Sequence, residues 1–446
     1  MIDLLILGAG PAGMAAAIEA SRLGLSVQLL DENAAPGGQV HRNARADARG
    51  PGDIQAHAGA KLMAELAASG ADCVYGATLW AIEPGPTAFY SVNGAARRVE
   101  AKRIILAPGA TERALPIPGW TLPGVMGVGA AQTLLKSAGL VPQGEVWIAG
   151  QGPLLWLYAA QALAKGGRIA GILDMSDPGA WRRAVWRLPC ALRKPRYLML
   201  GLSWMRAVTK AVPVHCGRAI RALGTDRLEA IEIDGVRHAA DTLLLHDGVV
   251  PNTQITRAIQ GLRHEWNEAQ RAFRPVLDEY GHTSVAGVMV AGDSGGIGGA
   301  WAAALSGRIA AIGAACDLGL FGVEQRDALA GPLMLQRGDE LAPRGFLDTL
   351  YAPLPVPAAA DTILCRCEEV TRGTIDNAAQ LGCLGVNQLK AFTRAGMGAC
   401  QGRTCHPLIH AAMAEARHAP AADMEAMRTR FPTKPLTIGE LAALAE

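Results

Sequence analysis

A glycine-rich turn between a buried strand and a helix occurs twice in the chain, and this repeat constrains the fold more than any other feature. The first copy has the order Gly8-Ala-Gly10-Pro11-Ala12-Gly13. Glycines at these three positions allow a tight turn, contact between backbone and a pyrophosphate, and close packing of helix on strand. The helix N-terminus then faces the anion. The turn therefore predicts a dinucleotide site.

The residues around this turn complete a nucleotide-binding unit. A strand over residues 2–7 precedes it, and a helix over 14–23 and a second strand over 26–30 follow. Asp31 ends the second strand, about where such folds place the acid that binds a ribose hydroxyl, and Glu32 is its neighbour. The pattern predicts a parallel α/β sheet with Asp31 and Glu32 beside the nucleotide.

Three further segments favour FAD over NAD at this site. Pro36-Gly37-Gly38-Gln39 resembles the loop that lies on FAD in glutathione-reductase-like flavoproteins, although a surface turn would use the same residues. A strand over 103–111, containing Ala107, Gly109 and Thr111, resembles a second mark of that superfamily, with Pro108 in place of Thr. Residues 283–293 resemble its closing motif, in which the Asp after Gly292 binds the ribityl chain. Asp293 could also cap a helix.

The second copy of the turn lies 142 residues after the first, with Gly150 in the place of Gly8 and Gly152 in the place of Gly10. A strand over 168–173 with Asp174 at its end follows. This repeat is typical of an NAD(P)H-binding lobe inserted into an FAD-binding lobe. Leu155 replaces the third glycine, and its side chain would push the helix away from the strand. The sequence thus argues against nicotinamide binding there.

Four cysteines near the C-terminus form a CxC pair and a CxxxxC pair, separated by 32 residues. They are Cys365, Cys367, Cys400 and Cys405. Four thiolates suit an iron-sulfur cluster, whereas structural zinc sites favour paired CxxC knuckles; zinc remains the alternative. Two short helices, from about 371 to 379 and from Asn387 to a C-cap at Gly396, are expected to bridge the gap. Lys390, Arg394 and Arg403 could offset thiolate charge or simply be exposed.

Composition limits the remaining choices. With 446 residues the chain has room for two or three domains, and its net charge of +2 gives no indication of nucleic-acid binding. The sequence begins directly with a strand and has no uncharged apolar run of about 18 residues, so neither a signal peptide nor a spanning helix is expected and the cytoplasm is the predicted location. Residues 181–210 hold eight basic residues and three Trp without an acid. They predict a solvated face, a partner-subunit surface or a membrane-surface helix.

Together these motifs resemble the FAD-binding alpha subunits of heteromeric bacterial amine and amino-acid dehydrogenases, a group that includes subunits of opine oxidase, D-hydroxyproline dehydrogenase and hydrogen cyanide synthase. The four-cysteine segment is similar to the bacterioferritin-associated-ferredoxin domain, which holds a [2Fe-2S] cluster. The likeness runs through nearly the whole chain, including Pro118 to Gly124. The resemblance implies an α/β flavoprotein with two dinucleotide-binding domains of the glutathione-reductase-like type and a small C-terminal helical iron-sulfur domain.

The resemblance also implies domain boundaries within the chain and separate roles for the subunits of a complex. We expect an FAD-binding domain over 1–115 and 245–320, an altered NAD(P)-binding-like domain over 116–244, a connecting segment over 321–360, a [2Fe-2S] domain over 361–412 and a tail over 413–446. A beta subunit with its own FAD would oxidise an amino acid or opine, and this chain would carry the electrons onward. Further expectations are an FMN at the interface with this partner, attachment to the inner membrane through the complex, and a small ferredoxin-like gamma subunit.

No catalytic acid or base stands out in the sequence. His41, just after the Gly-Gly-Gln loop, is the nearest candidate, and an exposed loop histidine is the alternative. The chain has no CxxC or CxxxxC where a disulfide reductase of this fold would need one. Two other functions stay open at this point: a stand-alone NAD(P)H-dependent flavoprotein reductase, and a non-redox subunit that binds a nucleotide and a zinc ion structurally.

Overall fold

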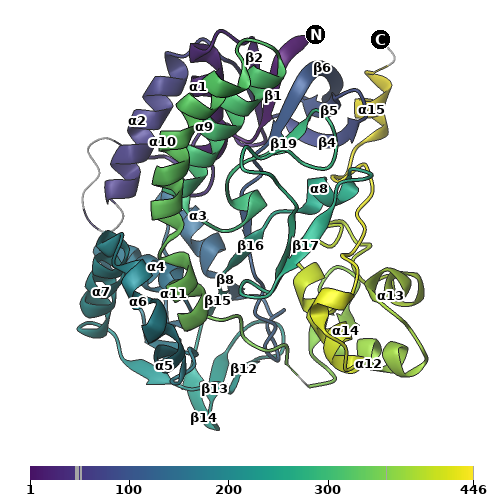
Figure 1. Cartoon of the computed structure of the whole chain (residues 1–446). Helices are drawn as coiled ribbons and strands as arrows, with labels where there is room; N and C mark the ends of the chain where they lie inside the picture. Colours follow the sequence, from purple (N-terminus) through teal and green to yellow (C-terminus); the bar gives the residue numbers. More distant parts are fainter. Residues whose placement is uncertain (46–49, 51–52, 358, 445–446) are drawn as a thin grey trace.

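In the computed structural model the chain forms two α/β lobes and a helical C-terminal module, and the structure describes residues 1–45, 50, 53–357 and 359–444. The first lobe contains the N-terminal residues and the segment that leads into the two long helices α9 (Ala300–Asp317) and α10 (Val323–Leu341). These two helices are green in Figure 1. The second lobe, in blue and teal, lies below it, and the module, in yellow-green, lies beside both. Ala358 of the predicted linker lies outside the described residues.

The first lobe is built on a seven-stranded sheet in the order β3-β2-β1-β6-β5-β4, with β19 paired to β6. Strands β3, β2, β1, β6 and β19 are parallel, and β4 and β5 extend the sheet antiparallel. The strands are β1 (Ile2–Leu7), β2 (Val27–Asp31), β3 (Asp72–Tyr75), β4 (Thr78–Glu83), β5 (Thr87–Val92), β6 (Ala95–Leu106) and β19 (Val288–Val290). The carboxyl ends of β1, β2, β6 and β19 meet at one edge, which is where an open α/β sheet binds its ligand.

Four helices lie on one side of this sheet, and α1 and α9 approach each other closely. They are α1 (Pro11–Arg22), α2 (Asp53–Ala67), α9 (Ala300–Asp317) and α10 (Val323–Leu341). A Cβ on Gly307 of α9 would lie 1.9 Å from the carbonyl oxygen of Ala12 in α1, so glycine is required at this crossing. Alanines of both helices form the buried core between them and the strands. This packing holds the N-terminus of α1 at the carboxyl edge of the sheet.

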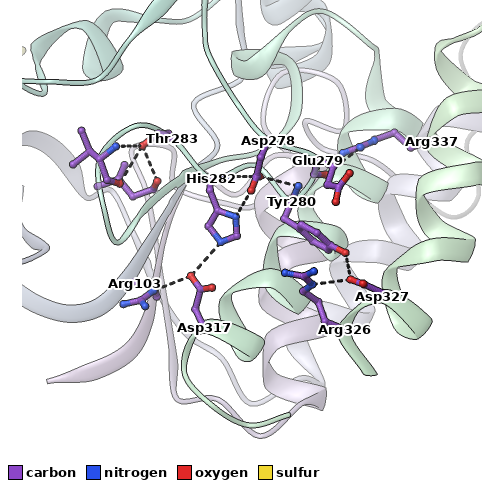
Figure 2. A network of polar contacts seen from close by, with 12 residues as sticks. Arg103, Asp278, Glu279, Tyr280, His282, Thr283, Asp317, Arg326, Asp327 and Arg337 are labelled. Atoms are coloured by element: carbon purple, nitrogen blue, oxygen red, sulfur yellow. Dashed lines mark hydrogen bonds and ion pairs between the residues drawn. The ribbon is translucent and has the colours of Figure 1, made fainter. Parts of the chain in front are cut away.

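A polar network fixes the segment that leads into β19 (Figure 2). The ring of His282 contacts Asp278 through Nδ1 at 2.8 Å and Asp317 of α9 through Nε2 at 3.1 Å. Arg103 of β6 donates to the same Asp317 carboxylate at 3.1 Å, and Tyr280 donates to Asp327 of α10. The network ties this segment to both long helices, and it thereby positions the residues that follow β19.

The second lobe has a fully parallel five-stranded sheet in the order β11-β10-β9-β15-β8. Its strands are β8 (Val125–Gly127), β9 (Val146–Gln151), β10 (Gly171–Asp174), β11 (Val214–Cys216) and β15 (Thr242–Asp247). Its helices are α3 (Val128–Ala138), α4 (Pro153–Ala164) and α7 (Pro195–Thr209), and a small sheet β12 (Ile220–Leu223), β13 (Ala230–Ile233) and β14 (Val236–Ala239) lies at its end. Since β15 pairs with β9 and β8, the chain returns to the first lobe after Asp247, later than the expected boundary at 245.

A short two-stranded sheet connects the lobes, and a hairpin follows it. The connecting strands are β7 (Ala110–Glu112) and β16 (Val249–Pro251), which are antiparallel. Next come α8 (Gln254–Ala258) and the hairpin β17 (His264–Asn267) and β18 (Ala272–Pro275). The hairpin supplies Trp266 and Phe273, whose rings contact His410 of the module. The module therefore docks on the first lobe through this hairpin.

The C-terminal module is helical and is followed by a tail that returns to the first lobe. The chain reaches it through α11 (Arg344–Leu350), and the module consists of β20 (Ile363–Cys365), β21 (Val370–Thr371), α12 (Arg372–Gln380), α13 (Val386–Thr393) and α14 (His406–Ala416). Helix α14 crosses the expected boundary at 412, because its buried face continues to Ala414. In Figure 1 the yellow tail runs past α8 to α15 (Ile438–Ala442) beside β6.

The basic segment over residues 181–210 has part of its positive charge neutralised by ion pairs. It forms α5 (Ala180–Ala184), α6 (Leu188–Ala191) and α7. Lys194 and Arg196 both pair with Glu340 of α10, so this part of the segment joins the two lobes. Trp186 remains 86% exposed and Met199 63% exposed, which keeps a partner-subunit surface as a prediction. No helix among the described residues is long and apolar enough to cross a membrane.

Candidate cofactor sites

The first glycine turn leaves an open space over Gly10. A Cβ on Gly8 would lie 2.4 Å from the carbonyl oxygen of Ala107, and a Cβ on Gly13 would lie 1.7 Å from that of Gly8. A Cβ on Gly10 would meet no atom within 4 Å. Gly10 is the N-cap of α1 and no side chain caps the helix. Because the first backbone N–H groups of a helix need a partner, this space fits a phosphate group.

Asp31 fixes the turn from the end of β2. Its buried carboxylate accepts hydrogen bonds from the backbone N–H of Ala9 at 2.5 Å and from the backbone and side-chain nitrogens of Asn33, both at 2.7 Å. An ionised carboxylate has about four acceptor positions, so it can still accept from a ribose hydroxyl. Glu32, by contrast, forms an ion pair with Lys434 of the tail at 2.7 Å. The structure thus brings Asp31, and not Glu32, to the glycine turn.

The Gly-Gly-Gln loop lies directly on the turn. The N–H of Gly37 donates to the carbonyl of Ala9 at 2.8 Å, and a Cβ on Gly38 would lie 2.9 Å from the Cα of Gly10. Both glycines have positive φ, at 120° and 57°, so side chains are disfavoured for a backbone reason as well. This contact sets the loop over the space that Gly10 leaves open.

Helix α3 of the second lobe supports the same loop from the other side. Lys136 donates from Nζ to the carbonyls of Gln39 and Val40, at 3.1 and 3.0 Å, and Thr133 donates to the side-chain oxygen of Gln39 at 3.3 Å. Burial lowers the pKa of Lys136 to about 8. Sequence reasoning missed both residues, since they lie about 95 positions from the loop and carry no motif.

The end of β6 and the strands after it continue the edge of the site. The N–H of Ala107 donates to the carbonyl of Leu7 at 2.8 Å, which locks the two strand ends together. Gly109 has φ of 71°, a Cβ on it would meet nothing within 4 Å, and its carbonyl accepts from the N–H of Asn252 at 3.0 Å. Thr111 lies on β7 opposite Val250 of β16. Open space over Gly109 suits a flat ring system close to the backbone.

The closing motif packs on α1 and prepares the start of α9. A Cβ on Gly292 would lie 2.7 Å from the Cβ of Ala12, so only glycine fits beside the first turn of α1. The carboxylate of Asp293 accepts from the N–H groups of Gly298 and Gly299, both at 2.9 Å, while Gly299 is the N-cap of α9. Asp293 is therefore not the N-cap itself, and it braces the loop that enters α9.

The second glycine turn has a histidine ring beside it. A Cβ on Gly150 would lie 1.8 Å from the carbonyl of His246, which matches the contact of Gly8 with Ala107. The ring of His246 reaches to within 3.8 Å of a Cβ on Gly152, and its Nδ1 contacts Glu112 at 2.6 Å. Leu155 is 1% exposed and packs in the core of this lobe. The ring of His246 thus lies beside the space over Gly152, whereas no atom lies within 4 Å of a Cβ on Gly10.

His41 is buried, so the alternative of an exposed loop histidine is wrong. It is 5% exposed, and a Cβ on Gly59 of α2 would lie 2.6 Å from its ring, which places the ring against that helix. Burial, and to a lesser extent the charge of Lys136, lowers its pKa to about 4. A neutral, enclosed imidazole packed on a helix supports the loop.

The four predicted cluster cysteines come together in the module. Cys405 donates hydrogen bonds to Cys365 and Cys400, and the thiol of Cys400 also contacts that of Cys367. These bonds lower the pKa of Cys365 to about 6 and that of Cys400 to about 4, while donation and burial raise the pKa of Cys405. Burial also raises the pKa of Cys367. Among the described residues no three His, Cys, Asp or Glu side chains surround a single metal-sized position.

Glycines and one methionine shape the loops around these thiols. The N–H of Gly396 donates to the sulfur of Cys365 at 3.4 Å, and a Cβ on Gly398 would lie 2.3 Å from that of Cys367. Cβ atoms on Gly396 and Gly402 would lie 2.5 and 2.7 Å from the sulfur of Met427. Met427 of the tail therefore packs against the loops around the cage. Four thiols with a backbone donor to sulfur fit a thiolate-ligated iron centre.

The cations predicted beside the cage are used differently. Lys390 donates to the carbonyl of Arg428 at 2.7 Å, and Arg394 forms an ion pair with Glu368 at 2.9 Å on the surface. Arg403 is partly buried. Helix α13 ends at Thr393 rather than near Gly396, because Arg394 itself takes the left-handed conformation, with φ of 60°. Neither Lys390 nor Arg394 contacts a cage sulfur.

Helix α8 of the first lobe contacts the cage, which no sequence motif indicated. Gln254 donates from Nε2 to the carbonyls of Cys400 and Thr433, at 3.0 and 3.2 Å. Arg257 donates to the carbonyl of Met427 at 2.5 Å and interacts electrostatically with Cys405. Burial lowers the pKa of Arg257 to about 10, so it is a cation at neutral pH.

Two family models match the chain. Residues 2–150 match the pyridine nucleotide-disulphide oxidoreductase family, and residues 363–415 match the BFD-like [2Fe-2S] binding domain. The second match favours iron over the zinc alternative, and it covers all four cage cysteines. Together the two matches imply FAD and a [2Fe-2S] cluster as cofactors.

Curated relatives align with the whole chain. The opine oxidase A subunit of Rhizobium meliloti is 42% identical over 99% of this chain and 87% of its own length, and the Agrobacterium tumefaciens (strain Ach5) protein is 42% identical over 99% and 92%. The chain belongs to the family of opine oxidase A subunits. Hydrogen cyanide synthase subunit HcnB of Pseudomonas aeruginosa is 33% identical over 97% of this chain and 96% of that relative. The resemblance inferred from the motifs is confirmed, and the chain is a subunit of a flavin-dependent oxidoreductase.

A solved structure confirms the fold class. L-proline dehydrogenase from P. horikoshii superposes with a TM-score of 0.73 at 19% identity, and the match covers 99% of this chain and 79% of that chain. At this identity the likeness speaks for the fold alone. It includes both lobes and the C-terminal module.

Proposed function

We propose that this chain is the electron-transfer subunit of a heteromeric dehydrogenase in which a partner subunit oxidises a C–N bond of an amino acid or opine. The partner would be an FAD-containing beta subunit that holds the substrate. Relatives from two different systems, opine oxidase and hydrogen cyanide synthase, are named as subunits, which supports a chain that works within a complex. The proposal places substrate oxidation elsewhere, in keeping with the absence of a catalytic acid or base among the motifs.

The observation that carries the proposal is the pairing of two cofactor-sized sites on one lobe. The glycine turn has room for a phosphate over Gly10, and the four-thiol cage docks on the same lobe through α8. FAD, when bound, accepts electrons in pairs and releases them singly, and a [2Fe-2S] cluster exchanges one at a time.

The proposal assigns FAD to the carboxyl edge of the first sheet. The residues that would hold it are Gly8, Gly10, Pro11, Ala12, Gly13, Asp31, Gly37, Gly38, Gln39, Ala107, Gly109, Thr111, Gly292 and Asp293. Glu32, the remaining residue of the sequence prediction, is not assigned to this site, because its carboxylate pairs with Lys434 of the tail. Cys365, Cys367, Cys400 and Cys405 would ligate the cluster as thiolates. The cage loop supplies the backbone N–H of Gly396 to the sulfur of Cys365, and Met427 of the tail packs on the same loops.

The test compares the isolated chain with the reconstituted complex. The isolated chain is expected to bind FAD and iron, yet to oxidise no amino acid or opine until the copurifying partner is added. NADH alone should leave the flavin oxidised, because the ring of His246 beside the second turn is expected to hinder nicotinamide-dinucleotide binding. A Cys405→Ser variant should keep FAD, lose iron and abolish electron delivery to an external acceptor. Substrate oxidation by the isolated chain would refute the proposal.

The finer expectations are tested on the same material. The ratio of FMN to FAD released from the copurified complex tests an FMN between the subunits, and mass spectrometry of the complex tests a ferredoxin-like gamma subunit. Fractionation of intact cells tests attachment to the inner membrane through the complex.

A further inference from the structure

Helix α8 lies between the nucleotide edge of the first lobe and the four-thiol cage. Asn252, two residues before it, donates from its backbone to the carbonyl of Gly109 at 3.0 Å and from its side chain to that of Pro108 at 3.3 Å. Gln254, the first residue of α8, is 5% exposed and donates to the carbonyl of Cys400 at 3.0 Å. Asn252 and Gln254, two positions apart, thus join the backbone on the flavin side to a loop of the cage.

Arg257, one turn further along α8, brings a positive charge to the cage. Its Nε donates to the hydroxyl of Thr253 at 3.1 Å and its Nη1 to the carbonyl of Met427 at 2.5 Å. The sulfur of Met427 in turn packs between the cage loops at Gly396 and Gly402. The guanidinium is therefore held by hydrogen bonds against the residue that closes the cage.

We propose that Arg257 is a positioning residue that raises the reduction potential of the iron-sulfur centre and so favours electron transfer from the flavin side. This inference rests on the proposed function. Reduction adds a negative charge to a four-thiolate cluster, and a nearby desolvated cation stabilises that charge more than a cation in water would. Cys405 is the ligand whose charge acts on Arg257.

The other cations near the cage are poorly placed for this role. Arg394 has a side chain that is 66% exposed and is neutralised by Glu368. His264 and His410, which also lie at this docking surface, have pKa values lowered to about 4 by burial, and the pKa of His406 is lowered as well. These three rings are uncharged at neutral pH. Lys390 interacts with Cys405 too, but its hydrogen bond to the carbonyl of Arg428 is solvent-exposed, whereas that of Arg257 to the carbonyl of Met427 is partly buried.

The experiment is an EPR-monitored redox titration of the full chain, preceded by iron analysis and an EPR spectrum of the reduced wild-type protein. Arg257→Gln should lower the equilibrium constant for one-electron reduction at least tenfold, which corresponds to a fall of about 59 mV or more. Arg257→Lys, which keeps the charge, should stay within about threefold of wild type. The matched control Arg394→Gln removes an exposed cation from the C-terminal module. It should change the equilibrium constant for reduction less than about twofold.

The wild-type protein supplies a second measurement in case the neutral variant does not fold. A potential set by a desolvated cation should vary less than about threefold in equilibrium constant between 0.05 and 1 M salt, whereas exposed cations are screened over that range. A tenfold salt effect, or an unchanged potential in Arg257→Gln with iron and EPR signal intact, overturns the inference about Arg257 alone. A wild-type chain without iron would instead overturn the proposed function.

Discussion

The two nucleotide lobes share a turn and a sheet topology, but they differ in what stands above the middle glycine. In the first lobe Ala107 directly follows the strand beside the turn, and a Cβ on Gly10 would meet nothing within 4 Å. In the second lobe the corresponding strand carries His246, whose ring reaches Gly152 and contacts Glu112. We expect this one side chain on a neighbouring strand to hinder a pyrophosphate at the second turn.

The difference extends to the third glycine. Gly13 is required because a Cβ there would lie 1.7 Å from the carbonyl of Gly8, whereas Leu155 lies in the core of its lobe without breaking the helix–strand contact. The expectation that Leu155 pushes α4 off the strand is thus too simple, because the side chain turns into the apolar core.

Leu155 should give the largest effect. Leu155→Ala is expected to lower the free energy of unfolding by about 2–5 kcal/mol, because it leaves a cavity in the second lobe, and FAD should still bind. Chemical denaturation measures the free energy of unfolding, and the flavin content of the purified variant shows whether FAD still binds. Leu192→Ala, at a site 55% exposed, is the control. Leu155→Gly sharpens the comparison further: rapid flavin reduction by NADH in that variant would contradict the role given to His246.

Gly10 tests the open side of the comparison. Gly10→Val should weaken FAD binding roughly 100-fold, about 2.7 kcal/mol, because the new side chain would occupy the space for the pyrophosphate. The apo fold should persist, since the added atoms begin in open space. Fluorescence titration of the apoprotein measures the affinity, and circular dichroism the fold. Gly201→Val, at another unobstructed position in α7, should bind FAD normally; equal affinities of the two variants would place the cofactor elsewhere.

His41 gives a moderate effect that depends on pH. Its folded pKa of about 4 lies below the unfolded value of about 6.5, so the unfolded chain binds a proton more readily. Its contribution is complete above pH 6.5 and is lost as pH falls, by about 1.4 kcal/mol per pH unit down to about 4. Comparing the unfolding free energies of wild type and His41→Leu from pH 7 to 4.5 isolates this slope. Identical pH profiles would mean that His41 is not held neutral.

Glu32 should give the smallest effect. Its ion pair with Lys434 is solvent-exposed, so Glu32→Gln should change stability by less than about 1 kcal/mol and leave FAD affinity within about twofold. Asp31→Asn is the matched comparison, and it should weaken FAD binding much more because Asp31 braces the turn at Ala9. A similar loss of affinity in both variants would restore Glu32 as a ribose ligand.

Local patterns predicted what depends on local geometry. The strand–turn–helix unit, Asp31 and the four cysteines follow from spacing along a few residues, and the structure brings each set together. The histidine ring beside the second turn could not be predicted in this way, since His246 meets Gly150 and Gly152 through a strand pairing across about 95 residues. Arg257 was missed for the same reason. The end of α13 was misjudged because Arg394 adopts a left-handed conformation that glycine usually takes.

The most direct test of the account counts dinucleotides per chain. Cofactor released from the purified full-length protein by acid should amount to about one FAD per chain, and calorimetric titration with NADH should show no binding at millimolar concentration. Gly10→Val should abolish the FAD without creating a second site. Two bound dinucleotides per chain, or NADH binding that survives in Gly10→Val, would contradict the prediction that the first turn binds a dinucleotide and the second does not.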